Sequence, residues 1–502
     1  MATHDDLALN FHLMHPGGDS RPGDPNVAYC LDGTYHLHYI LRHDWAGPEA
    51  QEVDGRQISY SFIHVTSSDL LHWEWQPTKL QPSFTGHGMF SGTGFITKEG
   101  KPAAIYAGVA TPRRSFIAIA EDNQLSSWQL PQQVEPTGVP DDKRVVFEGD
   151  PDLFQVGDTY YAYAAGDNLE LCKSEDLVNW TYVGPLMSEE PADVASGEDT
   201  SCANMFMLGD KWMLLCISHQ FGCRYYLGDW DAAAEQYLPQ QHGRMNWARA
   251  GQSATAPEQR DFFAPESVLT ADGRRVMWAW LATSHPEIDD KTVQSLPREL
   301  SLHADGSLRV EPLRELETLR HSPLEVGNLV VRPVDAPRLK GGGGAPEATS
   351  AHIADLDGDA YEIRAWVRRA DAERARFGLL LFSEGRLDGT PVLVEPQAGI
   401  LRVGQTEAPF RVADLPPGED VELRVFVDKY LVEAFVNGRQ AALTVQMEQR
   451  GRQLRGYLFG RADRGVAPLT FQSIDIWRMT PTNQGFLAAR DSQIWEPDTA
   501  PR

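Results

Sequence analysis

Two aspartates, each directly before a proline, stand at the head of two similar segments of the sequence. Asp24 lies in "GDPNVAYCLDGTYHLHY" (23–39), and Asp150 lies in "GDPDLFQVGDTYYAY" (149–163). Each segment continues through a short apolar run, a Gly/Asp turn and an aromatic-rich run. Proline biases the residue before it toward an extended backbone, which would hold each carboxylate in one direction. The alternative is that Asp-Pro only begins a strand in each case, as turn residues often do.

Glu198 supplies a third carboxylate, shortly before another strand-like run. Carboxylates that cluster without basic or cysteine partners suit either a hard cation or the cleavage of a glycosidic bond. The D-x-D-x-D-G spacing of a calcium loop is absent, so we expect no metal and no cofactor. Glycosidic cleavage needs one carboxyl group to protonate the leaving oxygen and another to attack the sugar or activate water. Neighbouring negative charges would raise the pKa of the acid, as this chemistry requires.

Five glycine turns recur along the first part of the chain and indicate a repeat. They are Asp32-Gly33, Glu99-Gly100, Gly157-Asp158, Gly209-Asp210 and Asp272-Gly273. Each lies between two short β-type runs and is typical of a hairpin. Their intervals of roughly 50 to 70 residues hold about four short strands, the size of a propeller blade. We therefore predict an all-β fold with a five-bladed β-propeller over residues 1–322; an irregular β-sandwich is the alternative.

A propeller would explain why the acidic residues recur. The innermost strand of every blade lines the central axis, so the starts of the five hairpins meet at one mouth of the ring. Asp24, Asp150 and Glu198 precede the first strands of the first, third and fourth units. We expect these three carboxylates to share one pocket.

A second phrase is repeated after two of the hairpins. Residues 67–73 and 174–180 both read Ser-x-Asp-Leu-x-x-Trp, and 120–131 carries a looser version. We interpret these phrases as turns into the third strand of a blade. Their tryptophans, Trp73, Trp128 and Trp180, are predicted to pack between blades.

The character of the sequence changes after about residue 320. Four consecutive glycines in "LKGGGGAPEATS" (339–350) indicate a flexible loop. Several short strands with alternating apolar residues follow, as in "LRVFVDKYLVEAFV" (423–436). We predict a C-terminal β-sandwich domain over residues 323–482 and a polar tail over 483–502.

Bulk properties limit the partners of the chain. A length of 502 residues favours two domains. The net charge of −26 argues against nucleic acid and anionic membranes, whereas a neutral sugar would tolerate it. The five cysteines give no disulfide framework or zinc spacing. The N-terminal residues lack the features of a signal peptide, which gives the expectation of a cytoplasmic chain, or of a secreted one if a signal peptide was removed.

Several segments together resemble glycoside hydrolase family 32, the β-fructofuranosidase, levanase and inulinase group. They are "DPN…DGTYHLHY" (24–39), "HVTSSDLLHWEWQPTKLQP" (64–82), "MFSGTGF" (89–95), "GDPDLF" (149–154), "DFFAPESVL" (261–269), "SLPRELSL" (295–302) and "LRVFVDKYLVEAFVNG" (423–438). The resemblance implies a five-bladed propeller followed by a C-terminal sandwich. It also implies a fructose-containing oligo- or polysaccharide substrate, such as sucrose, levan or inulin.

The resemblance further implies roles for individual residues. Asp24 would be the nucleophile of a retaining double displacement, and Asp150 would stabilise the transition state by holding fructosyl hydroxyls. Glu198 would be the acid/base. Phe90 and Ser91 would line the site, and Asn26 would lie near the nucleophile.

The sequence departs from the family pattern at several places. Arg21-Pro22-Gly23 stands where the family usually has Trp-Met-Asn, Ile40 replaces a glutamine, and Gly149 replaces an arginine. The family's Glu-Cys-Pro-Asp segment corresponds to "GEDTSCANMF", so Glu198 lies three residues too early and Asp199 is its rival as acid/base. The Arg21 guanidinium would replace the lost arginine from another direction.

These departures leave three alternatives to hydrolysis of β-fructosides. The same site would serve a fructotransferase, including one that forms a cyclic difructose dianhydride. An inverting pentosidase on a related propeller would explain the lost fructose contacts. The third alternative is a carbohydrate-binding protein that has no catalytic activity. The C-terminal domain is expected to cover the propeller, shape the rim of the pocket or form contacts in a homodimer.

Overall fold

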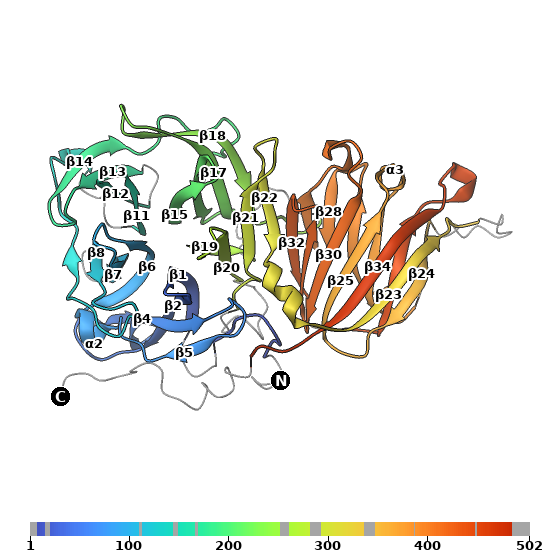
Figure 1. The fold of residues 1–502 in the computed structure, drawn as a ribbon, viewed down its shortest axis with the longest axis horizontal. Helices are drawn as coiled ribbons and strands as arrows, with labels where there is room; N and C mark the ends of the chain where they lie inside the picture. Colours follow the sequence, from blue (N-terminus) through green and yellow to red (C-terminus); the bar gives the residue numbers. More distant parts are fainter. Residues whose placement is uncertain are drawn as a thin grey trace.

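The computed structural model shows two all-β domains side by side (Figure 1). It describes residues 8–15, 21–109, 113–143, 149–165, 169–251, 261–281, 293–335, 347–385, 387–446 and 449–483, without the side chains of residues 21, 22 and 142. The predicted tail beyond Asn483 and most of the glycine-rich loop therefore lie outside the described residues.

The N-terminal domain consists of five sheets arranged around one axis, each built on four antiparallel strands. Blade 1 consists of β1 (Arg21–Leu31), β2 (Thr34–Asp44), β4 (Arg56–Ser67) and β3 (Gln51–Val53), with β5 (Glu74–Gln76) beside β4. Blade 2 consists of β6 (Gly88–Ile96), β7 (Pro102–Val109), β8 (Arg114–Ile119) and β9 (Gln132–Gln133). The short helix α2 (Pro82–Thr85) connects the two blades.

Blades 3 to 5 repeat the same order. Blade 3 consists of β11 (Pro151–Val156), β12 (Thr159–Ala164), β13 (Glu170–Ser174) and β14 (Trp180–Pro185), with β10 (Pro136–Thr137) parallel to β14 at its edge. Blade 4 consists of β15 (Ser201–Leu208), β16 (Lys211–Ser218), β17 (Gly222–Asp231) and β18 (Gln236–Arg244). Blade 5 consists of β19 (Phe263–Leu269), β20 (Arg275–Trp280), β21 (Arg298–Leu302) and β22 (Leu308–Pro312).

The five innermost strands close a ring, which confirms the predicted five-bladed propeller. β1 contacts β6, followed in order by β11, β15 and β19, and β19 contacts β1 again (Figure 1). The five predicted glycine turns join the first and second strands of the five blades. Their glycines all have a positive φ, between 58° and 85°, which a residue without a Cβ adopts at little cost.

The repeated Ser-x-Asp-Leu-x-x-Trp phrase forms the same turn in blades 1 and 3. The Ser67 hydroxyl accepts hydrogen bonds from two following amides, and Ser174 does the same. The turn leads from the third strand to the outer strand rather than into the third strand, which corrects the prediction. The reason is that the hydroxyl sits at the end of the third strand and caps the turn that follows. Trp73 packs edge to face on Trp278 of blade 5, with ring centroids 5.9 Å apart.

The C-terminal domain is a sandwich of two six-stranded sheets. The first sheet consists, in spatial order, of β23 (Arg320–Val331), β34 (Leu469–Met479), β25 (Ala360–Val367), β30 (Val421–Asp428), β31 (Leu431–Val436) and β32 (Gln440–Val445). The second consists of β24 (Ala348–Asp355), β33 (Gln453–Phe459), β26 (Phe377–Ser383), β27 (Thr390–Glu395), β28 (Ile400–Val403) and β29 (Thr406–Pro409). Between the sheets lies an apolar core of its own. The 3-10 helix η2 (Arg314–Leu319) joins the two domains.

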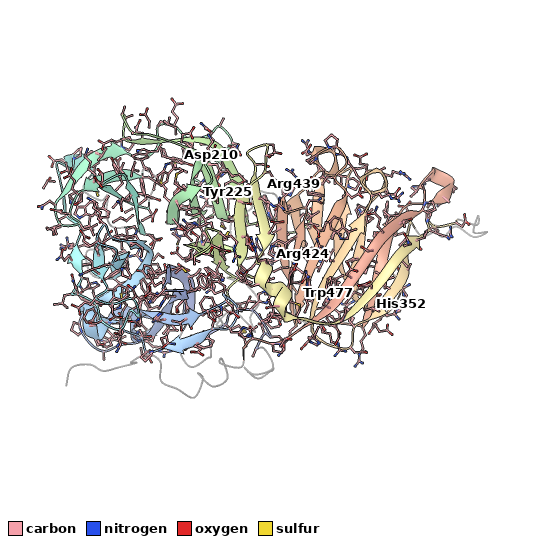
Figure 2. All side chains as sticks on the ribbon, viewed as in Figure 1. Asp210, Tyr225, His352, Arg424, Arg439 and Trp477 are labelled. Atoms are coloured by element: carbon pink, nitrogen blue, oxygen red, sulfur yellow. The ribbon has the colours of Figure 1, made fainter. Side chains whose placement is uncertain are left out.

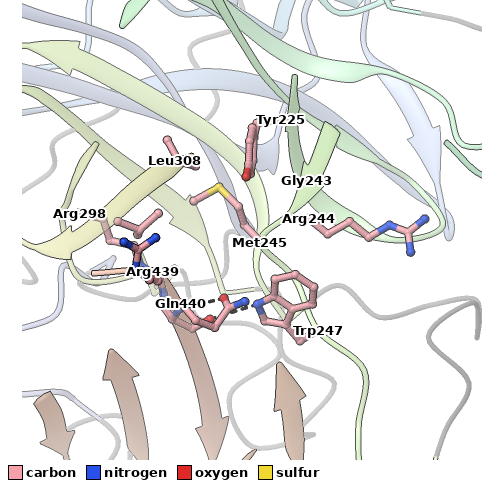
Figure 3. A pocket seen from close by; sticks show the side chains of 11 residues that line it. Tyr225, Gly243, Arg244, Met245, Trp247, Arg298, Leu308, Arg439 and Gln440 are labelled. Carbon is pink, nitrogen blue, oxygen red and sulfur yellow. Dashed lines mark hydrogen bonds between the residues drawn. The ribbon is translucent and has the colours of Figure 1, made fainter. Parts of the chain in front are cut away.

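The two domains make buried contacts where blades 4 and 5 meet β31 and β32; we call this region the junction. A hydrophobic cluster runs without a break from Trp278 in blade 5 to Phe435 in the sandwich. A cavity of about 120 Å³ lies at this junction and is bordered by Trp247, whose ring nitrogen donates to the Ala441 carbonyl (Figure 3). Figure 2 places Arg439 at the same junction.

Candidate functional site

Bulges at the starts of the inner strands shape one mouth of the propeller. The pairing of β1 with β2 shifts around Val27, that of β15 with β16 around Cys202, and that of β19 with β20 around Ala264. These three residues have φ values of 44°, 45° and 43°, although none is a glycine. A bulge of this kind redirects the side chains beside it. The inner strands therefore present residues toward the axis that a regular strand would place elsewhere.

The mouth gathers Asp24, Asp150 and Ser91 around the thiol of Cys202. The Ser91 hydroxyl donates to Asp24 Oδ2 at 3.1 Å. Cys202 Sγ lies 3.7 Å from the same Asp24 oxygen, 3.5 Å from Asp150 Oδ2 and 3.6 Å from Ser91 Oγ. The two aspartates therefore share one small space, as the propeller geometry predicted. We call these four residues the carboxylate centre.

Asn26 fixes the position of the first aspartate. Its side-chain amide donates to the Asp24 carbonyl at 2.9 Å, and its oxygen accepts from the Gly92 amide at 3.0 Å. Asn26 thus ties β1 to the inner strand of blade 2. The contact holds Asp24 beside Ser91.

The surroundings of Asp24 change its acidity. Burial raises the pKa of Asp24 to about 6, and the charge of Asp150 acts in the same direction. Hydrogen bonds from Ser91 and Cys202 favour the carboxylate and oppose this rise. Asp24 is therefore a carboxylate at neutral pH and carries a proton in mild acid.

Glu198 is placed differently from the two aspartates. Its carboxylate lies 2.9 Å from Arg244 Nη2, 3.3 Å from Arg224 Nη1 and 3.5 Å from His242 Nε2. These partners belong to the third and outer strands of blade 4, whereas the carboxylate centre is built on inner strands. Glu198 has no hydrogen bond or ion pair with Asp24 or Asp150 in the described part of the chain.

The ion pairs keep Glu198 charged. Burial alone would raise its pKa, but contacts with His242 and Arg244, the Ala195 amide and the charge of Arg224 outweigh burial and lower the pKa well below its usual range. The pKa of Asp199, its rival, is also lowered: burial opposes this shift, and the ring and amide of His219 cause it. In this arrangement Glu198 and Asp199 are both carboxylates: Glu198 holds Arg244, and Asp199 holds His219.

Phe90 and Arg21 are the remaining predicted site residues. Phe90 directly precedes the bulge of β6 and is half-buried, with the Arg113 guanidinium 4.8 Å from its ring centroid. The backbone of Arg21 begins β1 and pairs with Arg42, but its side chain lies outside what the structure describes.

Cys202, His242 and Arg244 are residues of this region to which sequence reasoning gave no role. Cys202 was visible as the cysteine of the "GEDTSCANMF" segment, but its contact with both aspartates depends on the bulge of β15. Arg244 had no signal, because it is the last residue of a polar outer strand. Figure 3 shows its guanidinium turned away from the junction cavity.

The described residues show neither a metal-binding cluster nor a membrane-spanning helix. The described residues contain no cluster of three or more histidine, cysteine or acidic side chains placed to hold a metal ion. Among the same residues there is no helix long and apolar enough to cross a membrane.

The sequence matches two domain families in succession. Residues 22–312 match the glycosyl hydrolases family 32 N-terminal domain, and residues 315–477 match the glycosyl hydrolases family 32 C-terminal domain. The chain belongs to glycosyl hydrolases family 32. This family 32 chain is therefore a glycoside hydrolase by descent, and the two matched regions correspond to the propeller and the sandwich.

Curated relatives and solved structures agree with this assignment. The chain is 27% identical over 466 residues to a probable sucrose-6-phosphate hydrolase of Psychromonas ingrahamii, covering 87% of this chain and 76% of that protein. It is 26% identical over 519 residues to the levanase of Bacillus subtilis, covering 91% and 69%. The crystal structure of fructan 1-exohydrolase IIa from Cichorium intybus superposes with a TM-score of 0.70 at 18% identity, covering 94% and 97%, and supports the fold.

Proposed function

We propose that this protein hydrolyses β-fructosidic bonds with retention of configuration, using Asp24 as the nucleophile. The observation that carries the proposal is the carboxylate centre, which stands at the axial mouth of a family 32 propeller. Relatives named as sucrose-6-phosphate hydrolase and levanase support sucrose, its 6-phosphate and levan- or inulin-type fructans as the substrates to test.

The chemistry divides into two displacements. The Asp24 carboxylate attacks the anomeric carbon of the fructosyl group, the glycosidic bond breaks, and the leaving oxygen takes a proton. Water then attacks the fructosyl ester, releases fructose and restores the Asp24 carboxylate. Asp150 lies beside Asp24 and is suited to accept hydrogen bonds from fructosyl hydroxyls.

Glu198 is the sequence-based candidate for the proton donor. Its ion pairs favour the charged carboxylate, so they oppose the uptake of the proton that this role needs. A general acid must carry its proton near the working pH. Glu198 would have to lose Arg244 before it could take up a proton. Asp199 would have to lose His219 in the same way.

A product screen tests the proposal. Purified protein is incubated with sucrose, sucrose 6-phosphate, inulin and levan, and released fructose and oligosaccharides are separated and quantified. We expect free fructose from at least one substrate and no turnover by Asp24→Asn. Asp152→Asn is the matched control, because Asp152 is buried nearby but bonds to Tyr163 and the Met205 amide instead. Turnover by Asp24→Asn at the wild-type rate would end the proposal.

A further inference from the structure

A second cavity lies at the opposite end of the propeller axis from the carboxylate centre. It has a volume of about 430 Å³ and is lined by the C-terminal halves of all five inner strands. A layer of buried polar side chains separates it from the carboxylate centre: Asn204 donates to Thr93 at 3.0 Å and accepts from Ser267. We call this space the lower cavity. Its volume falls within the range of small-molecule sites.

The rim of the lower cavity is apolar and open to solvent. Ile96, Met207 and Leu269 lie at or next to the ends of three inner strands and are 44%, 45% and 52% exposed. These residues are three of the few large apolar side chains that the described chain leaves exposed, and all three line one cavity. Large apolar side chains gathered around a concavity are typical of a binding site.

Among the described residues that line this cavity, Arg275 is the one with a cationic side chain. Its guanidinium lies 4.1 Å from the ring centroid of Phe206, and its Nη1 reaches Ser267 Oγ at 3.5 Å. Its Nε is buried without a hydrogen-bond partner, and Arg275 forms no ion pair with a described residue. A cation held in this way has unused capacity to bind an anion.

The acidic residue near Arg275 is Glu266, which forms no ion pair with it among the described residues. Burial raises the pKa of Glu266 to about 8 and favours the protonated form, whereas the charge of Arg275 acts in the opposite direction. Its Oε1 is already occupied by the Ser267 amide at 2.8 Å. Burial also lowers the pKa of Arg275 to about 10, which leaves it charged but poorly solvated.

We propose that the lower cavity binds an organic carboxylate with an apolar body, whose carboxylate pairs with Arg275 and whose chain lies against Ile96, Met207 and Leu269. A guanidinium binds a carboxylate through two parallel hydrogen bonds, and the unpaired Nε belongs to one such edge. The apolar rim would bury the apolar body of the ligand, which adds binding free energy beyond the ion pair with the carboxylate. The site is independent of the carboxylate centre.

Calorimetric titration of the full chain with octanoate tests the proposal. We expect binding of one octanoate in the millimolar range or tighter, with octanol and acetate each weaker by about tenfold or more, because each lacks one of the two contacts. Arg275→Gln should weaken octanoate by about tenfold or more, and Arg275→Lys by less, since it retains the charge. Arg56→Gln is the control, because Arg56 is an exposed arginine paired with Asp44 in blade 1.

A second variant and a second readout guard against misfolding. Leu269→Gln changes an exposed side chain and should weaken octanoate while leaving acetate unchanged. Fructoside turnover should stay at the wild-type level in all these variants, because none touches the carboxylate centre. Absence of octanoate binding to the wild-type chain, or equal binding by wild type and Arg275→Gln, would overturn the proposal.

Discussion

At the scale of single residues, the acidity of Asp24 depends on the groups that share its space. Ser91 and Cys202 stabilise the carboxylate, whereas burial and Asp150 destabilise it. A nucleophile attacks only in its ionised form, so on the proposed mechanism we expect the acid limb of the activity profile to lie near the Asp24 pKa of about 6.

Replacing Ser91 by alanine should move this limb to higher pH. The substitution removes a hydrogen bond to the charged form of Asp24, so the pKa should rise by roughly half a unit to one unit. The measurement is kcat/KM for sucrose or a fructan as a function of pH. Ser383→Ala, in the sandwich, serves as the control, and an unshifted acid limb in Ser91→Ala would show that this contact does not tune Asp24.

Glu198 allows a separate test of its ion pairs. Arg224 is fully buried, so Glu198→Gln should cost about 3–5 kcal/mol in the free energy of unfolding by leaving that charge without its partner. Glu235→Gln is the matched control, since it breaks a more exposed pair with Lys173 and should cost about 1 kcal/mol or less. Urea unfolding of the two variants measures the difference, and equal losses would show that the buried pairs do not anchor blade 4.

The same variant separates anchoring from proton donation. If Glu198 donates the proton, Glu198→Gln should lose turnover of sucrose but retain turnover of β-fructosyl fluoride, whose leaving group needs no proton. If Glu198 only anchors Arg224 and Arg244, both substrates should be affected alike. The ratio of the two rates therefore assigns the role.

At the scale of elements, bulges bring the side chains of distant blades together. Ala264 occupies the bulge of β19 with a φ of 43°, in the region that favours glycine. Ala279, equally buried in β20, is absent from the residues with positive φ. Comparing the two alanines therefore measures the backbone strain at the bulge of β19.

Glycine at these two positions should have different effects. Both substitutions lose one methyl group and raise the chain entropy of the unfolded state, but only Ala264→Gly also relieves left-handed backbone strain. We expect Ala264→Gly to be less destabilising than Ala279→Gly by about 1 kcal/mol in thermal or urea unfolding. The reverse order would mean that the bulge is unstrained.

The repeat and the hairpin turns could be predicted from the sequence because both depend on local patterns. Asp32-Gly33 and its four counterparts carry turn residues between alternating strands, and ring symmetry then places Asp24 near Asp150. The surroundings of Glu198 could not be predicted in this way. They depend on how the segment before β15 folds back onto Arg224 and Arg244, and no local pattern encodes that contact. Arg275 was equally hidden, since only the closed ring creates the lower cavity.

At the scale of the whole molecule, buried charges join the propeller to the sandwich. His12 lies 2.8 Å from Asp428 and 3.2 Å from Glu433, and Glu433 also pairs with Arg298 of blade 5 at 2.7 Å. Burial would lower the pKa of His12, but its two acidic partners outweigh burial and raise it to about 9. The imidazolium therefore helps to hold the N-terminal segment on the domain junction.

This junction should make stability depend on pH in a defined direction. The folded-state pKa of His12 exceeds the unfolded value, so its contribution is fully present below about pH 6.5 and is lost as pH rises through about 9. The difference in free energy of unfolding between wild type and His12→Gln should be a few kcal/mol near pH 6 and shrink toward pH 10. A difference that stays constant over this range would contradict the assignment.

The proposed mechanism forms a covalent bond between Asp24 and the fructosyl group, and the most direct measurement is the mass of the peptide that contains Asp24 during turnover. The enzyme is mixed with substrate, quenched in acid within the first turnovers, digested and analysed by mass spectrometry. We predict that the peptide containing Asp24 gains the mass of one fructosyl group, and that a fragment spectrum assigns it to the Asp24 carboxylate. Unmodified Asp24 peptide during active turnover, with the fructosyl group on another residue, would contradict the account.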